Sequence, residues 1–597
     1  MITERLQALR KEMLAQNIDA YIIPSSDPHQ SEYVADHWKV RAYFSGFTGS
    51  AGTLVITKDK AALWTDSRYF LQVEEECANS EVTLYKQTIP HAPEHIPWLC
   101  ETLENNTVIG IDFRQFSKAQ VDYLQEFATP KNIQLQHEAT IVDTIWKDRP
   151  SMPSQPIEEH LVVFSGETTA SKLSKVKNEI QRQKAGFYFF SSLDEIAWLF
   201  NIRSNDVDFT PLVTAYALVD IDKTILFCYK ERFSEELLQQ ASELQIEIYA
   251  YDTVLEHLPA LTANQKVITD DASLNYAIFN AIAERFIFQN SIAQQLKAIK
   301  NSVEIEGAKK CILKDGIALT KFFIWLEKEV EKRSISEYEI GEKLTHFRQQ
   351  QAHYTGNSFA PIVGYKGNGA IIHYSATKEG AALVQNEGIL LIDSGGQYKD
   401  GTTDITRTIW LGGTPSDTIK MAYTAVLKGY ISLEQLQFPL GTTGVQIDAF
   451  ARMHLWKHGM NYPHGTGHGI GSYGMVHEPA QGFATSTTTS RGSTVHQPNQ
   501  LTTIEPGYYV TDEFGIRIEN IVLSKVTQTT DFGTFLGFEP LTLCYVDTTL
   551  INIDSLTKEE VQWLNTYHAF VLQELTPHLT AEEHNWLADK CKAIGLS

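Results

Sequence analysis

Hydrophobic residues recur at spacings of three and four in two stretches of the N-terminal half, residues 5–27 and 172–194. A shift of 167 positions places RLQALRKEMLAQNIDAYIIPSSD on KLSKVKNEIQRQKAGFYFFSSLD without a gap, so that Leu6 falls on Leu173. Such spacing is typical of an amphipathic helix, and the short apolar runs AYII and FYFF that follow are typical of buried strands. The pattern predicts a helix, a strand and a polar turn, present twice.

Both copies continue with short segments that indicate further strands. TLVIT and AALWT follow in the first copy, and TAYALVDID and TILFCY follow in the second. A helix that alternates with apolar strands is typical of an α/β domain. We therefore expect two similar α/β domains over residues 1–150 and 151–297, separated at the stretch WKDRPSMPSQPIEEH, which is rich in proline and charge.

A third region, residues 298–597, begins with a long helical pattern. Asn301 is of the type preferred at a helix N-cap, and apolar residues follow it at helical spacing. Asp315 and Gly316 form a weak point in this pattern. Near the C-terminus, TKEE and TAEE each have the form of a capping box, which predicts two further helices. The apolar stripe consists of Ile305, Ala308, Ile312, Leu319, Phe323, Leu326 and Val330.

Between these helices a fully apolar strand, ILLI, runs directly into Asp393 within the segment GILLIDSGGQYKDGTTDITRTIWL. The segment predicts two strands around a polar turn, and the return strand carries Asp404. A hairpin centred near Tyr398–Lys399 would set the two carboxylates roughly opposite one another, about 5 Å apart. Two carboxylates at a buried hairpin repel strongly unless one is protonated or a cation lies between them.

The same arrangement recurs in TTIEPGYYVTDEFGIRIENIVL, which places Glu505 on one strand and Glu519 on the next, around the turn TDEFG. Alternation puts Ile516 and Ile518 on one face of the strand, and Arg517 and Glu519 on the other. The two hairpins are therefore predicted to bring four carboxylates to apolar strands.

The stretch HGTGHGIG places His464 and His468 four residues apart in a glycine-rich segment. Each glycine costs roughly 1 kcal/mol in a helix, so an extended conformation is expected. In an extended strand both histidines point to one face, and the glycines let a ligand approach the backbone. Taken alone, the stretch fits a turn with two solvated histidines equally well.

Any one of these acids, in an acidic protein, is most simply explained as a solvated surface group. Four acids at apolar strand positions together with an imidazole instead indicate metal ligation. An oxygen-rich set with one nitrogen suits Mn²⁺ or Co²⁺ better than a structural zinc. Four carboxylates exceed what one ion needs, whereas two ions bridged by two of them would use all four and would activate a shared water for hydrolysis.

Composition narrows the classes of function. With 597 residues, 43% of them hydrophobic and 21% charged, the chain is expected to be soluble and to contain several domains. The net charge of −23 opposes non-specific binding to nucleic acid. The sequence has neither an apolar run near the roughly 20 residues of a membrane span nor a signal-peptide core, so a cytoplasmic protein without membrane contact is expected. The six cysteines are scattered and include no CxxC pair, which suggests neither a zinc knuckle nor a disulfide framework.

The motifs DSGGQYKDGTTDITRT, HGTGHGIG, IEPGYY and GIRIEN together resemble those of the pita-bread metallopeptidases. With AYIIPSSDPHQSEYVADHWKVRAYFSGFTGSAGT, WTDSRYF, SLDEIAWLFNIR and GAIIHY, the chain is similar over nearly its whole length to the three-domain form of the aminopeptidase P (Xaa-Pro aminopeptidase) family. The resemblance implies an α/β and α+β architecture of two creatinase-N-like domains followed by a pita-bread catalytic domain. It also implies a homodimer that removes the N-terminal residue from peptides with proline in the second position.

The resemblance further implies the metal ligands. A hydroxide that bridges two divalent ions per chain would attack the carbonyl before proline, with manganese the expected metal and cobalt or zinc the alternatives. Asp404 and Glu519 would bridge the two ions. Asp393 would bind one ion, and His468 and Glu505 would bind the other.

Other roles follow from the same resemblance. Glu505 would move the proton, and His464 and His477 would act beside it in catalysis. His477 and His373 would hydrogen-bond the peptide and stabilise charge that develops during attack. Arg517 would neutralise the carboxylates from behind the ligands. The residues expected to contact the substrate are Arg68, which would reach in from the N-terminal domain, His373, His468 and His477.

Several alternatives remain open at this point. A prolidase shares the five ligands but cleaves only dipeptides, and its single N-terminal domain fits the repeat poorly. A methionine aminopeptidase is much shorter, and creatinase-like members lack the metal ligands. A binding module that has lost catalysis would lack part of the ligand set. The chain departs from the family pattern in one region. The segment ATSTTTSRGST is unusually polar, and VHQPNQLTTIEPG, which follows it, lacks the Gly-Met-Val pattern usual in the family. The conformation of residues 481–503 is therefore not predicted.

Overall fold

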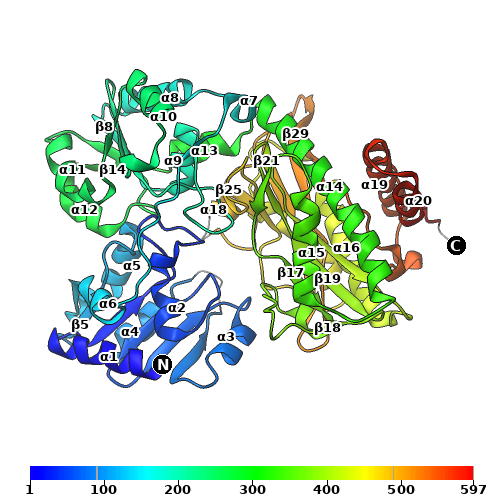
Figure 1. The fold of residues 1–597 in the computed structure, drawn as a ribbon, viewed down its shortest axis with the longest axis horizontal. Coiled ribbons are helices and arrows are strands. Elements are labelled where there is room, and N and C mark those ends of the chain that lie inside the picture. The colour runs from blue at the N-terminus through cyan, green and yellow to red at the C-terminus, as the bar shows by residue number, and fades with distance from the viewer. Residues whose placement is uncertain (89–91, 488–489, 596–597) are drawn as a thin grey trace. The chain divides into compact units, whose positions relative to one another are not determined.

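The computed structural model describes residues 1–88, 92–487 and 490–595. The chain divides into two compact units (Figure 1). The first consists of Met1–His160 and Glu167–Gln294, and the second of Leu161–Gly166 and Gln295–Ser597. Within the described ranges, no helix is both long and apolar enough to cross a membrane.

The first unit contains two six-stranded sheets with one plan. Their strand orders, β4-β3-β2-β1-β5-β6 and β12-β11-β10-β8-β13-β14, correspond position by position. Corresponding neighbours also pair in the same sense, antiparallel for β1–β2 and β8–β10, and parallel for β1–β5 and β8–β13. The strands are β1 (Ala20–Ile23), β2 (Thr53–Thr57), β3 (Ala61–Thr65), β4 (Val82–Lys86), β5 (Val108–Ile111), β6 (Gln134–His137), β8 (Phe187–Phe190), β10 (Tyr216–Val219), β11 (Thr224–Phe227), β12 (Ile246–Tyr249), β13 (Val267–Thr269) and β14 (Phe286–Phe288).

The helices that open the two repeats bury the stripes that predicted them. In α1 (Ile2–Ala15) the residues Leu6, Leu9 and Met13 are buried, and in α8 (Thr169–Gln183) the corresponding residues are buried as well. The prediction of two similar α/β repeats is therefore confirmed.

The two repeats meet at equivalent helix N-termini. Ser117 caps α5 (Lys118–Ala128), Asn275 caps α12 (Tyr276–Ile282), and the two caps form a β-bridge with one another. The backbone hydrogen bonds at this contact run from Lys118 N to Leu274 O, from Tyr276 N to Phe116 O, from Ala119 N to Asp271 O and from Ala277 N to Phe113 O.

The longest helix described in the second unit is α14 (Ser302–Val330). It starts at Asn301, whose side chain accepts hydrogen bonds from the backbone N–H groups of Val303 and Glu304. It runs without a break through Asp315 and Gly316, because the Asp315 carboxylate binds Arg348 and the bare Gly316 lets the carbonyl of Leu543 approach. The weak point predicted there is therefore wrong. Apart from Ile305, which is half-buried, the predicted stripe is buried.

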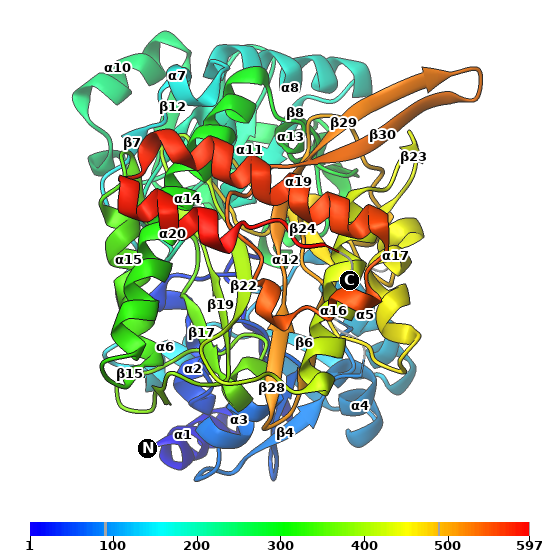
Figure 2. The same ribbon diagram turned by 90° about the vertical axis from the view of Figure 1, so that its right-hand side faces the viewer.

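Further helices pack around α14. α15 (Glu337–Gln349) lies against α14, and α16 (Asp417–Glu434) lies against α17 (Gly444–Trp456). The two capping boxes near the C-terminus begin α19 (Lys558–Leu575) and α20 (Ala581–Lys590), as predicted. Both helices contact α14, and Figure 2 shows them on the face turned toward the viewer.

The second unit holds the strands that carry the predicted chemistry. A three-stranded sheet has the order β17-β19-β22, and a six-stranded sheet has the order β23-β30-β29-β26-β24-β25. Figure 2 shows β29 and β30 extending together as a long hairpin. The strands are β17 (Ile362–Tyr365), β19 (Ile389–Ser394), β22 (Ile405–Trp410), β23 (Phe438–Pro439), β24 (Gly467–Gly469), β25 (Glu478–Phe483), β26 (Leu501–Ile504), β29 (Asn520–Thr530) and β30 (Gly533–Pro540), with the small hairpins β20 (Gly396–Tyr398)–β21 (Gly401–Thr402) and β27 (Gly507–Val510)–β28 (Phe514–Arg517).

Candidate metal centre

The first acidic hairpin is formed by β19 and β22, with the smaller pair β20 and β21 at its tip. Asp393 lies opposite Thr406, and Asp404 lies between β21 and β22, two residues before Thr406. The predicted face-to-face placement of Asp393 and Asp404 is therefore wrong by two residues. The turn lies one position later than expected, at Lys399–Asp400, because Tyr398 pairs with Gly401.

The second acidic hairpin forms around the turn TDEFG, as predicted. Ile504 pairs with Asn520, so the next step along the same ladder sets Glu505 against Glu519. The ladder is interrupted there. Glu505 and Glu519 therefore lie outside the regular strand pairs, between the ladder of β26 with β29 and that of β27 with β28.

The glycine-rich stretch is extended only around His468, over β24. His464 lies in a bend before this strand, because Arg452 of α17 donates hydrogen bonds to the carbonyls of Tyr462 (2.7 Å) and His464 (2.6 Å). The two histidines therefore do not share the face of one strand, and that prediction is wrong. His464 Nε2 instead lies 2.9 Å from the hydroxyl of Tyr509.

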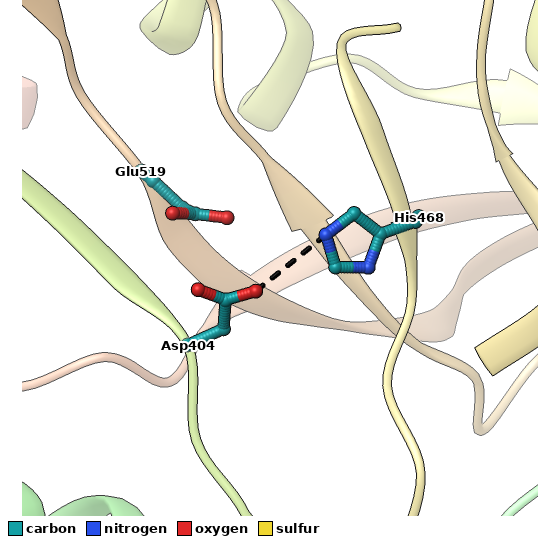
Figure 3. Close-up of side chains that lie close together, drawn as sticks. All are labelled: Asp404, His468 and Glu519. Atoms are coloured by element: carbon teal, nitrogen blue, oxygen red, sulfur yellow. Dashed lines mark ion pairs between the residues drawn. The ribbon is translucent and has the colours of Figure 1, made fainter. Parts of the chain in front are cut away.

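Figure 3 shows Asp404, His468 and Glu519 converging from three different strands or loops. One ligand atom from each lies within 4.8 Å of the others. His468 Nε2 is 3.5 Å from Asp404 Oδ2 and 3.5 Å from Glu505 Oε1. His468 Nδ1 is 3.0 Å from the carbonyl of Gly469, which can only accept, so Nδ1 carries a proton. Nε2, which lies beside the carboxylates, is the nitrogen that can bind a metal.

The electrostatics of the cluster favour a bound cation. Burial raises the pKa of Asp404 well above its usual value, and the charges of Asp393 and Glu505 raise it further. Burial and the charge of Asp404 do the same for Glu519. Burial raises the pKa of Glu505 to about 7, against the opposing effect of Arg517. Charged carboxylates in this space repel one another unless cations compensate them.

One oxygen of Asp393 gives independent support. Its Oδ2 accepts from Arg517 at 2.5 Å, whereas the buried Oδ1 has no hydrogen-bond partner among the residues that the structure describes. A buried carboxylate oxygen without a donor is costly, and a metal ion is a natural partner for it. The donor set of four carboxylates and one imidazole lone pair therefore fits divalent cations.

Arg517 organises the back of the cluster. Its guanidinium donates to Asp393, to Thr406 Oγ1 (3.1 Å) and to Tyr509 Oη (2.8 Å). Because Tyr509 accepts from Arg517, its own proton is available to His464. Thr406 in turn donates to Glu519 Oε2 at 2.8 Å.

Sequence reasoning missed Tyr509 and Thr406. Strand alternation could have found Tyr509, which stands four residues after Glu505 on the same strand path. Thr406 carries no such signal, because threonine is common in any strand.

The other predicted residues have different surroundings. The ring of His477 packs against that of His468, with centroids 4.4 Å apart. The next residue, Glu478, is held by the buried Lys297 (3.1 Å) and by Lys300. His373 lies half-buried, three residues after the turn η6 (Lys366–Ala370).

Arg68 belongs to the first unit, where its guanidinium forms two hydrogen bonds with Asp66, of 2.8 and 2.7 Å. Its predicted contact with a peptide in the second unit stays a prediction.

The segment that departs from the expected motif contains a short helix, α18 (Ser490–Ser493), which packs on β25. Residues 488–489 lie outside the described residues. The charge of Arg491 on α18 lowers the pKa of Glu505, so this segment borders the acidic cluster.

Comparisons with known families match nearly the entire chain. The second unit contains a match to metallopeptidase family M24 over residues 306–525, followed by the C-terminal region of peptidase M24 over residues 534–594. The creatinase/prolidase N-terminal domain matches twice, over residues 5–144 and 148–304.

Curated relatives match at full length. The chain is 39% identical to aminopeptidase P2 of Arabidopsis thaliana, covering 100% of this chain and 89% of that protein. It is 38% identical to a probable Xaa-Pro aminopeptidase P of Laccaria bicolor, covering 99% and 94%. This chain belongs to the aminopeptidase P family of M24 metallopeptidases.

Solved structures agree with this membership of the aminopeptidase P family. The X-prolyl aminopeptidase of Caenorhabditis elegans, described as a cytosolic enzyme with a di-nuclear active site, matches with a TM-score of 0.94 and 33% identity over 100% of both chains. A prolidase from Thermococcus sibiricus covers only 64% of this chain, with a TM-score of 0.50 and 20% identity, and shows a shared fold alone. Two creatinase-N-like domains followed by an M24 domain, as predicted, are therefore confirmed for this member of the aminopeptidase P family.

Proposed function

We propose that the chain is a metal-dependent aminopeptidase that releases the N-terminal residue from peptides with proline in the second position. The observation that carries the proposal is the convergence of buried carboxylates with the lone pair of His468, within 4.8 Å for Asp404, His468 and Glu519. The names and the fold of the relatives support the proline specificity, which no distance in the cluster determines.

We propose that two divalent ions bind per chain, as in the C. elegans relative described as di-nuclear. Asp404 and Glu519 would be shared between them, Asp393 would bind one, and His468 and Glu505 would bind the other. When bound, the ions supply Lewis acidity and an activated water for attack on the carbonyl carbon that precedes proline. Manganese is the proposed metal, with cobalt and zinc as alternatives that the same donors accept.

Glu505 is the proposed proton carrier. Its side chain is 18% exposed, against 5% for Asp404, so among these two it is the carboxylate that a peptide can reach. A carboxylate at the edge of the cluster can take a proton from the attacking water and give it to the leaving amine. His468 would remain a ligand, since its Nε2 faces the carboxylates.

The remaining residues would bind and orient the peptide. His477 lies against His468 and would donate to the developing oxyanion, and His373 would hydrogen-bond the peptide. His464 is held by Tyr509 in a fixed orientation beside the second acidic hairpin. Arg517 would hold Asp393 in place and balance its charge. Arg68 is proposed to contact residues beyond proline.

We also propose a cytosolic homodimer. The C. elegans relative is described as cytosolic. One face of α17 exposes Phe450 (38%), Met453 (37%) and Trp456 (49%), and such an apolar face suits contact with a second copy. Light scattering on the wild type and on Trp456→Glu tests the assembly, with a shift to monomer expected for the variant.

The test of function is a comparison of four substrates with the manganese-loaded protein: Xaa-Pro-Pro, Xaa-Pro, Xaa-Ala-Pro and an N-acetylated Xaa-Pro-Pro. Cleavage of the first after its N-terminal residue, with little cleavage of the third and none of the fourth, is expected. Cleavage confined to the dipeptide would indicate a prolidase. A protein that binds these peptides and cleaves none would be a binding module.

A further inference from the structure

Glu337, the first residue of α15, is a fully buried carboxylate that accepts hydrogen bonds from four groups. Its Oε1 accepts from the backbone N–H of Tyr365 (2.7 Å) and from the side chain of Asn368 (3.0 Å). Its Oε2 accepts from the hydroxyl of Tyr374 (2.8 Å) and from the backbone N–H of Ala382 (2.8 Å). All four donors are neutral groups.

These donors belong to one segment, residues 366–382, and to the residue just before it. Tyr365 is the last residue of β17, and Ala382 precedes β18 (Leu383–Val384). β18 pairs with β15 (Ile335–Ser336), which leads into Glu337, and the backbone N–H of Glu337 donates to the carbonyl of Ala382. The carboxylate therefore joins both ends and the middle of the segment.

The segment carries His373, next to the Tyr374 that Glu337 binds. Its beginning, η6, packs directly on β17 and β28: a Cβ on Gly515 would lie 1.7 Å from the carbonyl oxygen of Gly369, and one on Gly364 would lie 2.5 Å from its Cα. The strand β28 ends at Arg517, which binds Asp393. His373 thus follows a turn fixed against the strands of the metal centre.

We propose that Glu337 is a positioning residue that holds His373 in place for the reaction. The proposal rests on the proposed function, in which His373 contacts the peptide. Packing of η6 fixes the segment before His373, whereas the bond from Tyr374 to Glu337 fixes it directly after His373, and the bond from Ala382 fixes its end. Loss of these bonds would leave the segment held at its start by η6 and at its end by the pairing of β15 with β18, and would remove the restraint next to the histidine.

The chemistry of the site makes glutamate specific there. An ionised carboxylate only accepts, and its lone pairs match four donors. A glutamine at this position has one accepting oxygen and one NH₂ group, so in either orientation its NH₂ faces a backbone N–H, of Tyr365 or of Ala382. A backbone N–H cannot turn away from such a clash, so the segment must move.

The test is a double-mutant cycle of Glu337→Gln with His373→Ala, measured on the metal-loaded enzyme with Xaa-Pro-Pro. Glu337→Gln alone is expected to lower kcat about 10- to 100-fold, with metal content unchanged. In the His373→Ala background the same change is expected to lower kcat no further, because the residue through which it acts is gone. A merely structural role would not produce this non-additivity in kcat.

Two further variants complete the design. Glu339→Gln changes an acid on the same helix that binds the exposed Arg333, and it is expected to leave kcat unchanged. Tyr374→Phe removes one hydroxyl from Glu337 and should lower kcat about 5-fold, again only when His373 is present. If Glu337→Gln does not fold, Tyr374→Phe replaces it in the double-mutant cycle with His373→Ala.

The outcomes separate the two proposals. If His373→Ala impairs turnover and Glu337→Gln lowers kcat equally in both backgrounds, the positioning role is overturned while the role of His373 stands. If His373→Ala leaves turnover unchanged, the proposed function of His373 fails, and the positioning role fails with it.

Discussion

Buried carboxylates gathered around His468 make the metal-free centre unfavourable for the fold. Asp404 illustrates this, because burial and its neighbours Asp393 and Glu505 raise its pKa far above the usual value. A group whose charged form is disfavoured in the folded state subtracts from stability at neutral pH. The residues proposed to bind metal are therefore expected to oppose folding until the metal arrives.

Replacement of Asp404 by asparagine should abolish activity and yet stabilise the metal-free protein. The neutral amide removes the repulsion with Asp393 and Glu505, and we expect a gain of about 1–2 kcal/mol in the free energy of unfolding. Urea unfolding in the presence of a chelator measures it. The control is Asp400→Asn on the same hairpin, which breaks the ion pair with Lys314 (2.7 Å) and should destabilise. A metal-free Asp404→Asn protein less stable than the wild type would contradict this account.

His477→Ala should reduce turnover far more than metal content. Its ring lies against His468 but is assigned to the peptide, and loss of one donor to a developing oxyanion typically costs about 10²–10³ in kcat. Metal analysis alongside kcat tests the assignment. His477→Phe keeps an aromatic ring against His468 and should be equally inactive while retaining both ions. A variant that simply lost its metal would place His477 among the supports of the ligands.

Glu434 on α16 gives a prediction about pH that is independent of the metal centre. Burial raises its pKa to about 7, and the indole of Trp563 donates to it at 2.6 Å. Between its unfolded pKa of about 4.5 and its folded pKa of about 7, the folded protein holds a proton that the unfolded chain has released. Its contribution to stability therefore falls as pH rises through this window.

Glu434→Gln should accordingly be more stable than the wild type at pH 8, by up to about 3 kcal/mol, and similar to it near pH 4.5. The glutamine oxygen still accepts from Trp563. Urea unfolding of both proteins at several pH values measures the difference, and the exposed Glu513→Gln serves as control. If Glu434→Gln and the wild type were equally stable at pH 8, ionisation of Glu434 would not destabilise the folded protein, and the prediction would be wrong.

At the scale of elements, the strong periodic patterns were sufficient for prediction. Two helical stripes and the strands after them predicted the repeats. The segment around TDEFG predicted a hairpin with Glu505 on one arm and Glu519 on the other. These features depend on local sequence alone. The predicted pairing of Asp393 with Asp404 was wrong by two residues, since Asp393 pairs with Thr406. The side chains of GGQYKDG do not specify where the turn lies, so the register of this hairpin could not be predicted.

Features that depend on distant residues could not be predicted. His464 lies outside the strand of His468, because Arg452 on the helix α17 donates hydrogen bonds to the carbonyls of Tyr462 and His464. Strand alternation places Tyr509 on the same face as Glu505, but its contacts with Arg517 and His464 could not be predicted from it. The buried position of Gly316 likewise depends on Leu543, far along the chain.

Gly316 and Gly341 form a matched pair for testing helix packing. A Cβ on Gly316 in α14 would lie 2.7 Å from the carbonyl oxygen of Leu543, whereas one on Gly341 in α15 would meet its nearest atom, Pro361 Cβ, at an ordinary 3.5 Å. We expect Gly316→Ala to destabilise by about 1–3 kcal/mol through overpacking. Gly341→Ala should gain up to about 1 kcal/mol from helix propensity. Thermal and urea unfolding measure both, and equal effects in the two variants would contradict the prediction.

At the scale of the whole molecule, the predicted domain boundaries near residues 150 and 297 remain a proposal. The matched N-terminal domains end at residues 144 and 304, and the second compact unit begins again at Gln295. Limited proteolysis should cut first in the stretch between the two repeats, where exposed residues such as Ser151 and Ser154 lie outside the helices and strands.

The contact between the two repeats is reciprocal: Lys118 binds the residue before Asn275, and Tyr276 binds the residue before Ser117. Reciprocity of this kind is the signature of an isologous interface, in which two copies present the same patch to one another. The backbone contact between the repeats therefore has local two-fold symmetry. The N-terminal half has the form expected if the gene for a symmetric dimer was duplicated and fused. Because the two repeats now belong to one chain, they cannot dissociate from one another as separate subunits would.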